Sequence, residues 1–180
     1  WARVGGRVMN AAPGQSRPEQ AAARVTPSLQ RDLRTLGLDP GAPAFVRIFK
    51  REAELELWLR GKDGRYQLFR TYPICTYSGQ LGPKRRQGDN QAPEGFYRVA
   101  RGQLNPASRY HLAFNLGYPN AYERALGYTG DFLMVHGNCV SIGCYAMGDA
   151  AIEEIYTVVD AALRAGQPAF EVHAFPFRLD

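Results

Sequence analysis

The stretch from His136 to Met147, with the sequence HGNCVSIGCYAM, concentrates the residues best suited to covalent chemistry. It holds two of the three cysteines and one of the three histidines in the chain. A cysteine becomes a nucleophile when its pKa is lowered or its proton is taken, and a nearby imidazole does both. Gly143 before Cys144 favours a tight turn in which both amides can face a developing oxyanion. We therefore predict an acyl-transfer enzyme with Cys144 as nucleophile and His136 as base.

The same residues leave other interpretations open. A zinc site could use His136, Cys139, Cys144 and Cys75 as ligands, although the usual CxxC pairs are absent. Cys75 and Cys139 could instead form a disulfide in an oxidising compartment, and the sequence does not decide this. We interpret Cys139 as a packed or free thiol and Cys75 as a core residue. A Cys139–Cys144 bridge is disfavoured because it would block the nucleophile. A non-catalytic binding module would have an unreactive Cys144.

The composition favours a globular, single-domain protein. The chain has 180 residues, 45% of them hydrophobic and 12% aromatic, which is enough for a substantial core. Its net charge of +5 comes from scattered residues apart from Lys84-Arg85-Arg86, unlike the basic face of a nucleic-acid-binding protein. No apolar run approaches the roughly 20 residues needed to span a bilayer. Because the chain begins with Trp1, we interpret it as processed or trimmed, so any signal peptide would already be removed.

Two helices are expected. Residues 1–26 indicate a loosely packed leader, and Thr26-Pro27 predicts the start of a short amphipathic helix that ends at Gly37. A longer helix with one apolar side is predicted from an N-cap at Asp149 to a stop at Gly166. We divide the chain into an N-terminal leader, 1–43, and a catalytic domain, 44–180.

Runs of β composition predict about eight short strands, so we expect an α+β domain of mainly antiparallel sheet. In the run 110–116, alternation places His111 and Asn115 on one face, where they would line a cleft. The turn-rich segment 78–95 is expected to be a functional loop. The clearest runs are 45–49, 55–59, 66–75, 95–99, 110–116, 132–135 and 170–175.

Several motifs together resemble a known family. His136-Gly137 is followed by Ser141-Ile142-Gly143-Cys144, and residues 92–97 read APEGFY. The segments YPIC (72–75), GPK (82–84) and YPNAY (118–122) add to the pattern. With these motifs, residues 44–175 resemble the L,D-transpeptidase catalytic domain of the YkuD type, most closely its YafK-like branch.

The resemblance implies a β-sandwich with two or three helices and a Cys144 thioester formed on a peptidoglycan stem peptide. His136 would be the base, and Gly143, Ser141 and Gly137 would form the oxyanion and active-site loop. No metal or organic cofactor is implied, and the expected location is the periplasm or cell envelope of a Gram-negative bacterium. Further residues are expected in the substrate cleft, namely His111, Tyr110, Asp89 and Lys84.

Two departures from the family pattern indicate the reaction. Many members have a second histidine two residues before the cysteine and an arginine or asparagine two residues after it, where this chain has Ile142 and Ala146. Without the arginine, a fixed cation for a substrate carboxylate is missing. Crosslinking of a tetrapeptide donor is therefore less expected. The YafK-like branch that the chain resembles is associated with hydrolysis of the amide between diaminopimelate and a tethered outer-membrane lipoprotein, so the resemblance implies this hydrolysis. The alternative is transpeptidation that forms 3-3 crosslinks or attaches lipoprotein. A sortase-like enzyme would need a longer His–Cys separation and an arginine beyond the cysteine.

Overall fold

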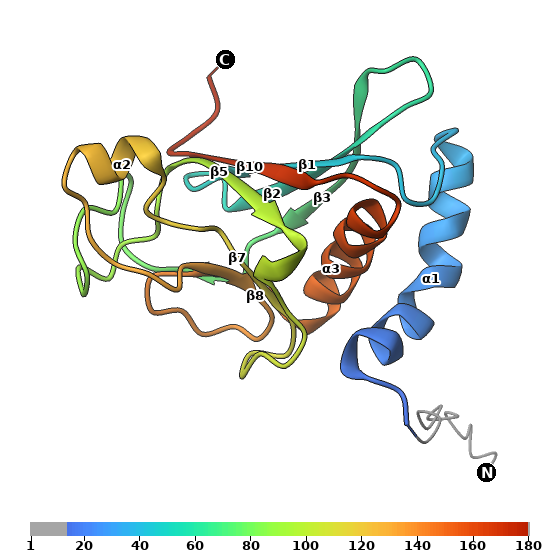
Figure 1. Cartoon of the computed structure of the whole chain (residues 1–180), viewed down its shortest axis with the longest axis horizontal. Helices are drawn as coiled ribbons and strands as arrows, with labels where there is room; N and C mark the ends of the chain where they lie inside the picture. The colour runs from blue at the N-terminus through green and yellow to red at the C-terminus, as the bar shows by residue number, and fades with distance from the viewer. Residues whose placement is uncertain (1–13, 180) are drawn as a thin grey trace, which may run out of the picture.

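The computed structural model describes residues 14–179, which form two five-stranded sheets and three helices (Figure 1). Sheet A has the strand order β3-β2-β1-β10-β5, and sheet B has the order β4-β9-β8-β7-β6. The α+β prediction is therefore confirmed. The helices are α1 (Arg17–Thr35), α2 (Ala121–Ala125) and α3 (Asp149–Arg164), and a 3-10 turn covers Arg101–Gln103.

Sheet A consists of long, regular strands that the sequence pattern identifies well. They alternate buried apolar residues with more exposed ones, as expected for a sheet with one covered face. Neighbouring strands are antiparallel except for β1 and β10, which are parallel. The strands are β1 (Ala44–Phe49), β2 (Glu54–Arg60), β3 (Tyr66–Pro73), β5 (Gly95–Ala100) and β10 (Ala169–Phe175).

Sheet B is assembled from strands of only two or three residues. The strand predicted over 110–116 is wrong, because β7 covers only Ala113–Asn115 and His111 has a φ of +74° that breaks the extended run. Leu112, Ala113 and Phe114 are all fully buried, so the expected alternation is also absent. The strands are β4 (Thr76–Tyr77), β6 (Leu104–Asn105), β7 (Ala113–Asn115), β8 (Met134–His136) and β9 (Tyr145–Ala146).

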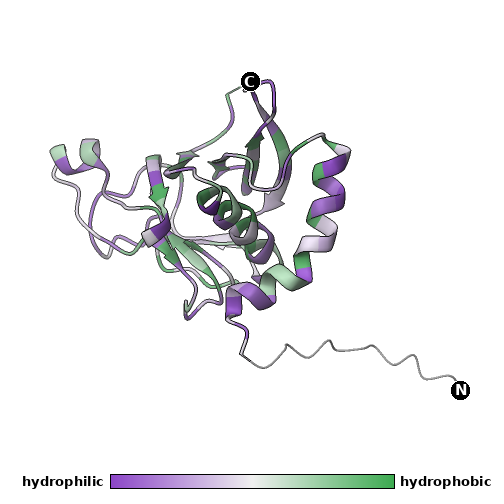
Figure 2. Ribbon diagram, turned by 45° about the vertical axis from the view of Figure 1, so that its right-hand side comes forward, coloured by the Kyte–Doolittle hydropathy of each residue, from purple (hydrophilic) through white to green (hydrophobic). Residues whose placement is uncertain are grey.

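Helix α3 lies at the centre of the core and contacts β1, β10 and β7, so both sheets pack on it. Its buried side includes Ile152, Ile155 and Val159, as the apolar stripe predicts. Gly148, rather than Asp149, is the N-cap residue, because Asp149 Oδ1 accepts a hydrogen bond from the Asn138 amide instead. Hydrophobic residues colour much of this central region in Figure 2, whereas hydrophilic residues dominate α1.

Helix α1 begins about ten residues before the predicted start at Thr26-Pro27, so that prediction is wrong. Its actual start is a capping box, in which Ser16 N donates to Glu19 Oε2 at 2.7 Å. Pro27 lies inside the helix, where it removes one backbone hydrogen bond. The helix continues because Ala21, Leu29 and Leu33 are buried on the side that faces α3. The leader expected over 1–26 is therefore helical from residue 17, and residues 1–13 lie outside the described chain.

No helix within residues 14–179 is both long and apolar enough to cross a membrane.

Candidate active site

His136 ends strand β8, and Cys144 directly precedes the neighbouring strand β9. Strands β8 and β9 run parallel, with Val135 opposite Tyr145 and His136 opposite Ala146. Val135 and Tyr145 are fully buried in the core. His136 follows Val135, and Cys144 precedes Tyr145. Because side chains alternate along a strand, both residues lie on the sheet face opposite to Val135 and Tyr145. The parallel pairing thus places both residues on neighbouring segments of sheet B, although a loop separates them in the sequence.

The imidazole of His136 is held in one tautomer. Its Nδ1 lies 2.5 Å from the Gly137 carbonyl oxygen, which can only accept, so Nδ1 carries the proton and Nε2 keeps its lone pair. The Tyr110 ring stacks on the imidazole with a centroid distance of 4.6 Å. Burial lowers the pKa of His136, and the hydrogen bond to Gly137 opposes this only in part. His136 is therefore a neutral imidazole near neutral pH, as a general base requires.

The Cys144 thiol is partly buried and uncharged at rest. Its Sγ accepts from the Met134 amide at 3.5 Å and donates to the Phe132 carbonyl at 3.7 Å. Burial raises the pKa of Cys144, although the Met134 amide and the charge of Lys84 work in the opposite direction. The thiol pKa is therefore not lowered as the sequence suggested, because the effect of burial outweighs those of the Met134 amide and Lys84. Both the thiol and the imidazole are therefore uncharged near neutral pH.

Backbone amides of the expected oxyanion loop already have acceptors. Gly143 N donates to Ser78 Oγ at 2.7 Å, and Cys144 N donates to Ser141 Oγ at 3.1 Å. An oxyanion could bind either amide only by displacing a hydroxyl. Ser78 was not identified from the sequence, because its position 65 residues from Gly143 and its turn-rich surroundings give no sign of the pairing.

A disulfide joins Cys75 to Cys139, with their Cα atoms 5.5 Å apart. The interpretation of Cys139 as a packed or free thiol and of Cys75 as a core residue is therefore wrong, and both residues are exposed. Their Cα atoms lie within the usual range for a bridge. The amide of Cys75 also donates to the Ala146 carbonyl of β9. The zinc alternative loses two of its four ligands, and Cys144 remains a free thiol.

The loop that carries Lys84 and Asp89 borders the site. Lys84 Nζ donates to Asp89 Oδ1 at 2.6 Å, and Asp89 Oδ2 accepts from the amides of Arg85 and Arg86. Asp89 therefore organises its own loop. Lys84 is almost fully buried and lines a small cleft of about 100 Å³ beside Gly143.

Apolar side chains border this cleft. Phe132 and Ile142 also line it, and they are 70% and 79% exposed. Large exposed apolar residues beside a reactive group are typical of a ligand-binding surface. Phe132 was not predicted as a site residue, because its position at the start of an apolar run indicated a strand.

Of the remaining residues predicted in the substrate cleft, one lies at the site and the other lies against α3. Tyr110 lies at the site through its stacking on His136, but the His111 ring bonds to Glu153 on α3 at 2.8 Å. Gly137 has no room for a side chain, because an added Cβ would lie 2.7 Å from the Tyr110 carbonyl oxygen. A glycine next to His136 is therefore a packing requirement.

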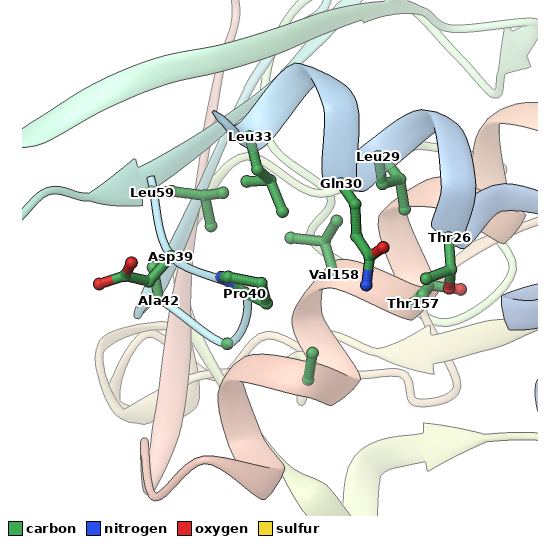
Figure 3. Close-up of a pocket in the computed structure, with 12 residues that line it drawn as sticks. Thr26, Leu29, Gln30, Leu33, Asp39, Pro40, Ala42, Leu59, Thr157 and Val158 are labelled. Atoms are coloured by element: carbon green, nitrogen blue, oxygen red, sulfur yellow. The ribbon is translucent and has the colours of Figure 1, made fainter. Parts of the chain in front are cut away.

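A second cavity, also of about 100 Å³, lies between α1 and α3 (Figure 3). Its walls are mainly apolar and include Leu29, Leu33 and Val158. None of the predicted site residues lines it.

The fold is a two-sheet α+β domain with a histidine and a free cysteine on neighbouring segments of sheet B. A family model for the L,D-transpeptidase catalytic domain, YkuD, matches residues 44–168. YafK of Escherichia coli strain K12, an L,D-transpeptidase by name, is 55% identical over 139 residues, which cover 77% of this chain and 56% of YafK. The YafK of Escherichia coli O157:H7 matches equally well. The chain belongs to the L,D-transpeptidase catalytic-domain family and spans about half the length of the curated relatives that it matches.

Solved structures share the fold at low sequence identity. A variant of the helical cell shape determining protein Pgp2 from Campylobacter jejuni has a TM-score of 0.60 at 22% identity, covering 84% of this chain and 55% of that chain. Bd1075 of Bdellovibrio bacteriovorus has a TM-score of 0.52 at 20% identity, covering 76% and 49%. These similarities concern the fold alone.

Proposed function

We propose that Cys144 is the nucleophile of an acyl-transfer reaction on peptidoglycan stem peptides and that His136 is its base. The observation that carries this proposal is the bond from His136 Nδ1 to the Gly137 carbonyl, which leaves Nε2 as the basic nitrogen on the face that Cys144 shares. His136 takes the thiol proton as sulfur bonds to the substrate carbonyl carbon. The same proton passes to the amide nitrogen as its bond to carbon breaks, and an amine leaves.

In the second half of the reaction, water replaces the amine. His136 accepts a proton from water as the hydroxide bonds to the thioester carbonyl, and the carbon–sulfur bond breaks. The thiolate that leaves recovers the proton from His136, so the enzyme returns to its resting state. The products are a free carboxyl group and the released amine.

We infer that the bond cleaved joins diaminopimelate to a tethered lipoprotein. Ile142 and Ala146 stand where many family members have a histidine and an arginine or asparagine, so neither position supplies a cation for the terminal carboxylate of a peptide donor. Lys84, which lines the same cleft as Ile142, is already paired with Asp89. Water as acceptor requires no second peptide-binding site. The exposed apolar side chains of Phe132 and Ile142 suit an aliphatic chain next to the scissile amide.

The same proposal places the protein in the periplasm of a Gram-negative bacterium. Disulfides persist in oxidising compartments such as the periplasm, and the Cys75–Cys139 bridge supports this location. Peptidoglycan and its lipoprotein tethers would be accessible there.

Muropeptide analysis tests the reaction. Sacculi with tethered lipoprotein are incubated with the wild type, with Cys144→Ala, and with Thr35→Ala as a matched control on α1. Loss of lipoprotein remnants from diaminopimelate in the wild type and in Thr35→Ala, but not in Cys144→Ala, supports the hydrolase. New 3-3 crosslinks, or newly attached lipoprotein, would establish transpeptidation instead. No Cys144-dependent change would contradict the enzyme proposal.

A further inference from the structure

Two serine hydroxyls from separate segments meet beneath the nucleophile. Ser78 Oγ and Ser141 Oγ lie 2.9 Å apart, and Ser78 follows β4 whereas Ser141 belongs to the loop before Cys144. Ser141 Oγ contacts both the carbonyl oxygen of Cys144, at 2.6 Å, and its amide, at 3.1 Å. Ser78 Oγ accepts from the amide of Gly143 at 2.7 Å.

The direction of each hydrogen bond in this group follows from its chemistry. A hydroxyl has one proton to donate and two lone pairs. The Cys144 carbonyl can only accept, so Ser141 must give its proton to that oxygen. Ser141 Oγ can then only accept from Ser78, so Ser78 donates to Ser141 and accepts from Gly143. Each group in the chain therefore has a partner of the correct type.

Ser78 itself is anchored by residues outside the catalytic loop. Its carbonyl accepts from the Ala92 amide at 2.8 Å, which closes the 78–92 loop at its base. The fully buried Lys50 Nζ donates to the carbonyls of Gln80, Gly82 and Ala92 and holds the same loop from below. Ser78 is therefore held in place independently of the loop 137–143, and its hydrogen bonds can fix the position of that loop.

We propose that Ser78 is a positioning residue for Cys144. It fixes the Gly143 amide directly and orients the Ser141 hydroxyl, which holds both backbone polar groups of Cys144. Gly143 has a φ of +87°, so the turn before the nucleophile is one that only a few residue types adopt readily. The inference depends on the proposed role of Cys144 as nucleophile. The competing account is that Ser78 only occupies an amide that serves the oxyanion.

Two substitutions of Ser78 and one control variant separate these accounts. Ser78→Ala removes both hydrogen bonds, Ser78→Thr keeps the hydroxyl, and Thr35→Ala deletes an exposed hydroxyl on α1 as the matched control. The measured quantities are kcat and KM for amide cleavage and the rate of Cys144 alkylation by iodoacetamide between pH 6 and pH 10. A circular dichroism melt checks that each variant is folded.

The positioning role predicts that Ser78→Ala lowers kcat by roughly 10- to 100-fold with little change in KM, since a small displacement of a reacting group has effects of this size. Its alkylation profile should also shift along the pH axis. Ser78→Thr should stay within about threefold of the wild type, a difference well below 1.4 kcal/mol. If Ser78→Ala does not fold, Ser78→Cys serves in its place and is expected to fall between the threonine variant and the alanine variant.

Unchanged or faster cleavage by Ser78→Ala would overturn the proposal. It would favour the competing account, in which Ser78 only occupies the Gly143 amide that serves the oxyanion. Loss of activity in Ser78→Thr equal to that in Ser78→Ala would also overturn it. If the wild type cleaves no amide in a Cys144-dependent manner, the proposed function fails. The alkylation profile still tests Ser78 in that case, because it needs no substrate.

Discussion

The two sheets of this fold are held together in different ways. The strands of sheet A are six to eight residues long and form continuous backbone ladders. The strands of sheet B have two or three residues, yet this sheet carries His136 and places Cys144. Short ladders give few backbone hydrogen bonds, so the geometry of the site must come from other contacts.

Those contacts are one covalent bond and a set of side-chain hydrogen bonds. The Cys75–Cys139 disulfide ties the loop after His136 to the end of β3, and Lys50 and Asp89 secure the loop over the cleft. The comparison indicates that a sheet with functional loops needs such ties, whereas a sheet with long strands does not. Each tie can be removed separately, and the expected loss of stability decreases from the disulfide to Lys50 and then to Asp89.

Removing the disulfide should have the largest effect. The bridge closes a loop with a sequence separation of 64 residues, for which loss of chain entropy in the unfolded state corresponds to about 4 kcal/mol. We expect Cys75→Ala/Cys139→Ala to lose stability of that order in urea titrations. Hydrogen exchange should rise in β8 and β9 before it rises in β1 and β2. If hydrogen exchange rose equally in sheet A and sheet B, the claim that sheet B depends more on the disulfide would be contradicted.

Replacing Lys50 should be nearly as costly. Its ammonium group is fully buried and forms an ion pair with Glu94 at 3.1 Å besides its three carbonyl partners. Lys50→Met leaves the Ala92 carbonyl without a donor and removes the cation that faces Glu94, and loss of one partner from a buried pair costs about 3 kcal/mol or more. Lys62→Met, which removes an exposed pair with Asp39, is the control and should change the urea midpoint very little. Similar midpoints for the two variants would refute the role of Lys50.

Asp89 should contribute a smaller, pH-dependent amount. Burial alone would raise the pKa of Asp89, but hydrogen bonds from Lys84 and from the amides of Arg85 and Arg86 outweigh it and lower the value from 3.8 to about 2. Because the folded pKa lies below the unfolded value, the stabilisation is present above pH 3.8 and disappears as the pH falls through about 2. The shift corresponds to about 2 kcal/mol.

Comparing the wild type with Asp89→Asn in urea from pH 7 to pH 2.5 checks this prediction. The difference in unfolding free energy should be largest at pH 7 and should shrink towards the acid end. A difference that stays constant with pH would show that the carboxylate charge is unimportant.

The smallest effect is expected on the helix that supports sheet A. Asp160 and Arg164 form an i,i+4 ion pair on α3 at 2.8 Å, and such pairs contribute roughly 0.2–0.5 kcal/mol. Asp160→Ala should therefore lower the thermal midpoint only slightly and leave amide cleavage unchanged. A loss of activity in this variant would mean that the site depends on α3 more than on its own ties.

The same difference explains what could be predicted from the sequence. The strands of sheet A were identified because runs of β composition over several residues are a strong signal, strengthened by alternation in 55–59. Strands such as Tyr145–Ala146 are too short to show any period. Their pairing depends on contacts distant in sequence.

Local signals were also misread near the N-terminus. The pattern Ser16-x-x-Glu19 with Pro18 marks the helix start, but Thr26-Pro27 gives the same signal at a position inside the helix. The packing of α1 on α3 determines which of the two signals begins the helix. At the site, the family motif indicated Cys144 and His136. The hydrogen bond between Ser78 and Gly143 could not be predicted from a local sequence pattern, because it joins residues far apart in the chain.

The most direct test of the catalytic account is to locate the acyl group on the enzyme. The wild type, Cys144→Ala and His136→Gln are mixed with a lipoprotein-tethered muropeptide, quenched in acid and mapped by mass spectrometry between pH 5 and pH 8. The account predicts an acyl group on the peptide that contains Cys144, and a rate that falls in acid below the lowered pKa of His136. His136→Gln should acylate roughly 100- to 10,000-fold more slowly and lose this pH dependence. An acyl group on another residue, or equally fast acylation without His136, would contradict it.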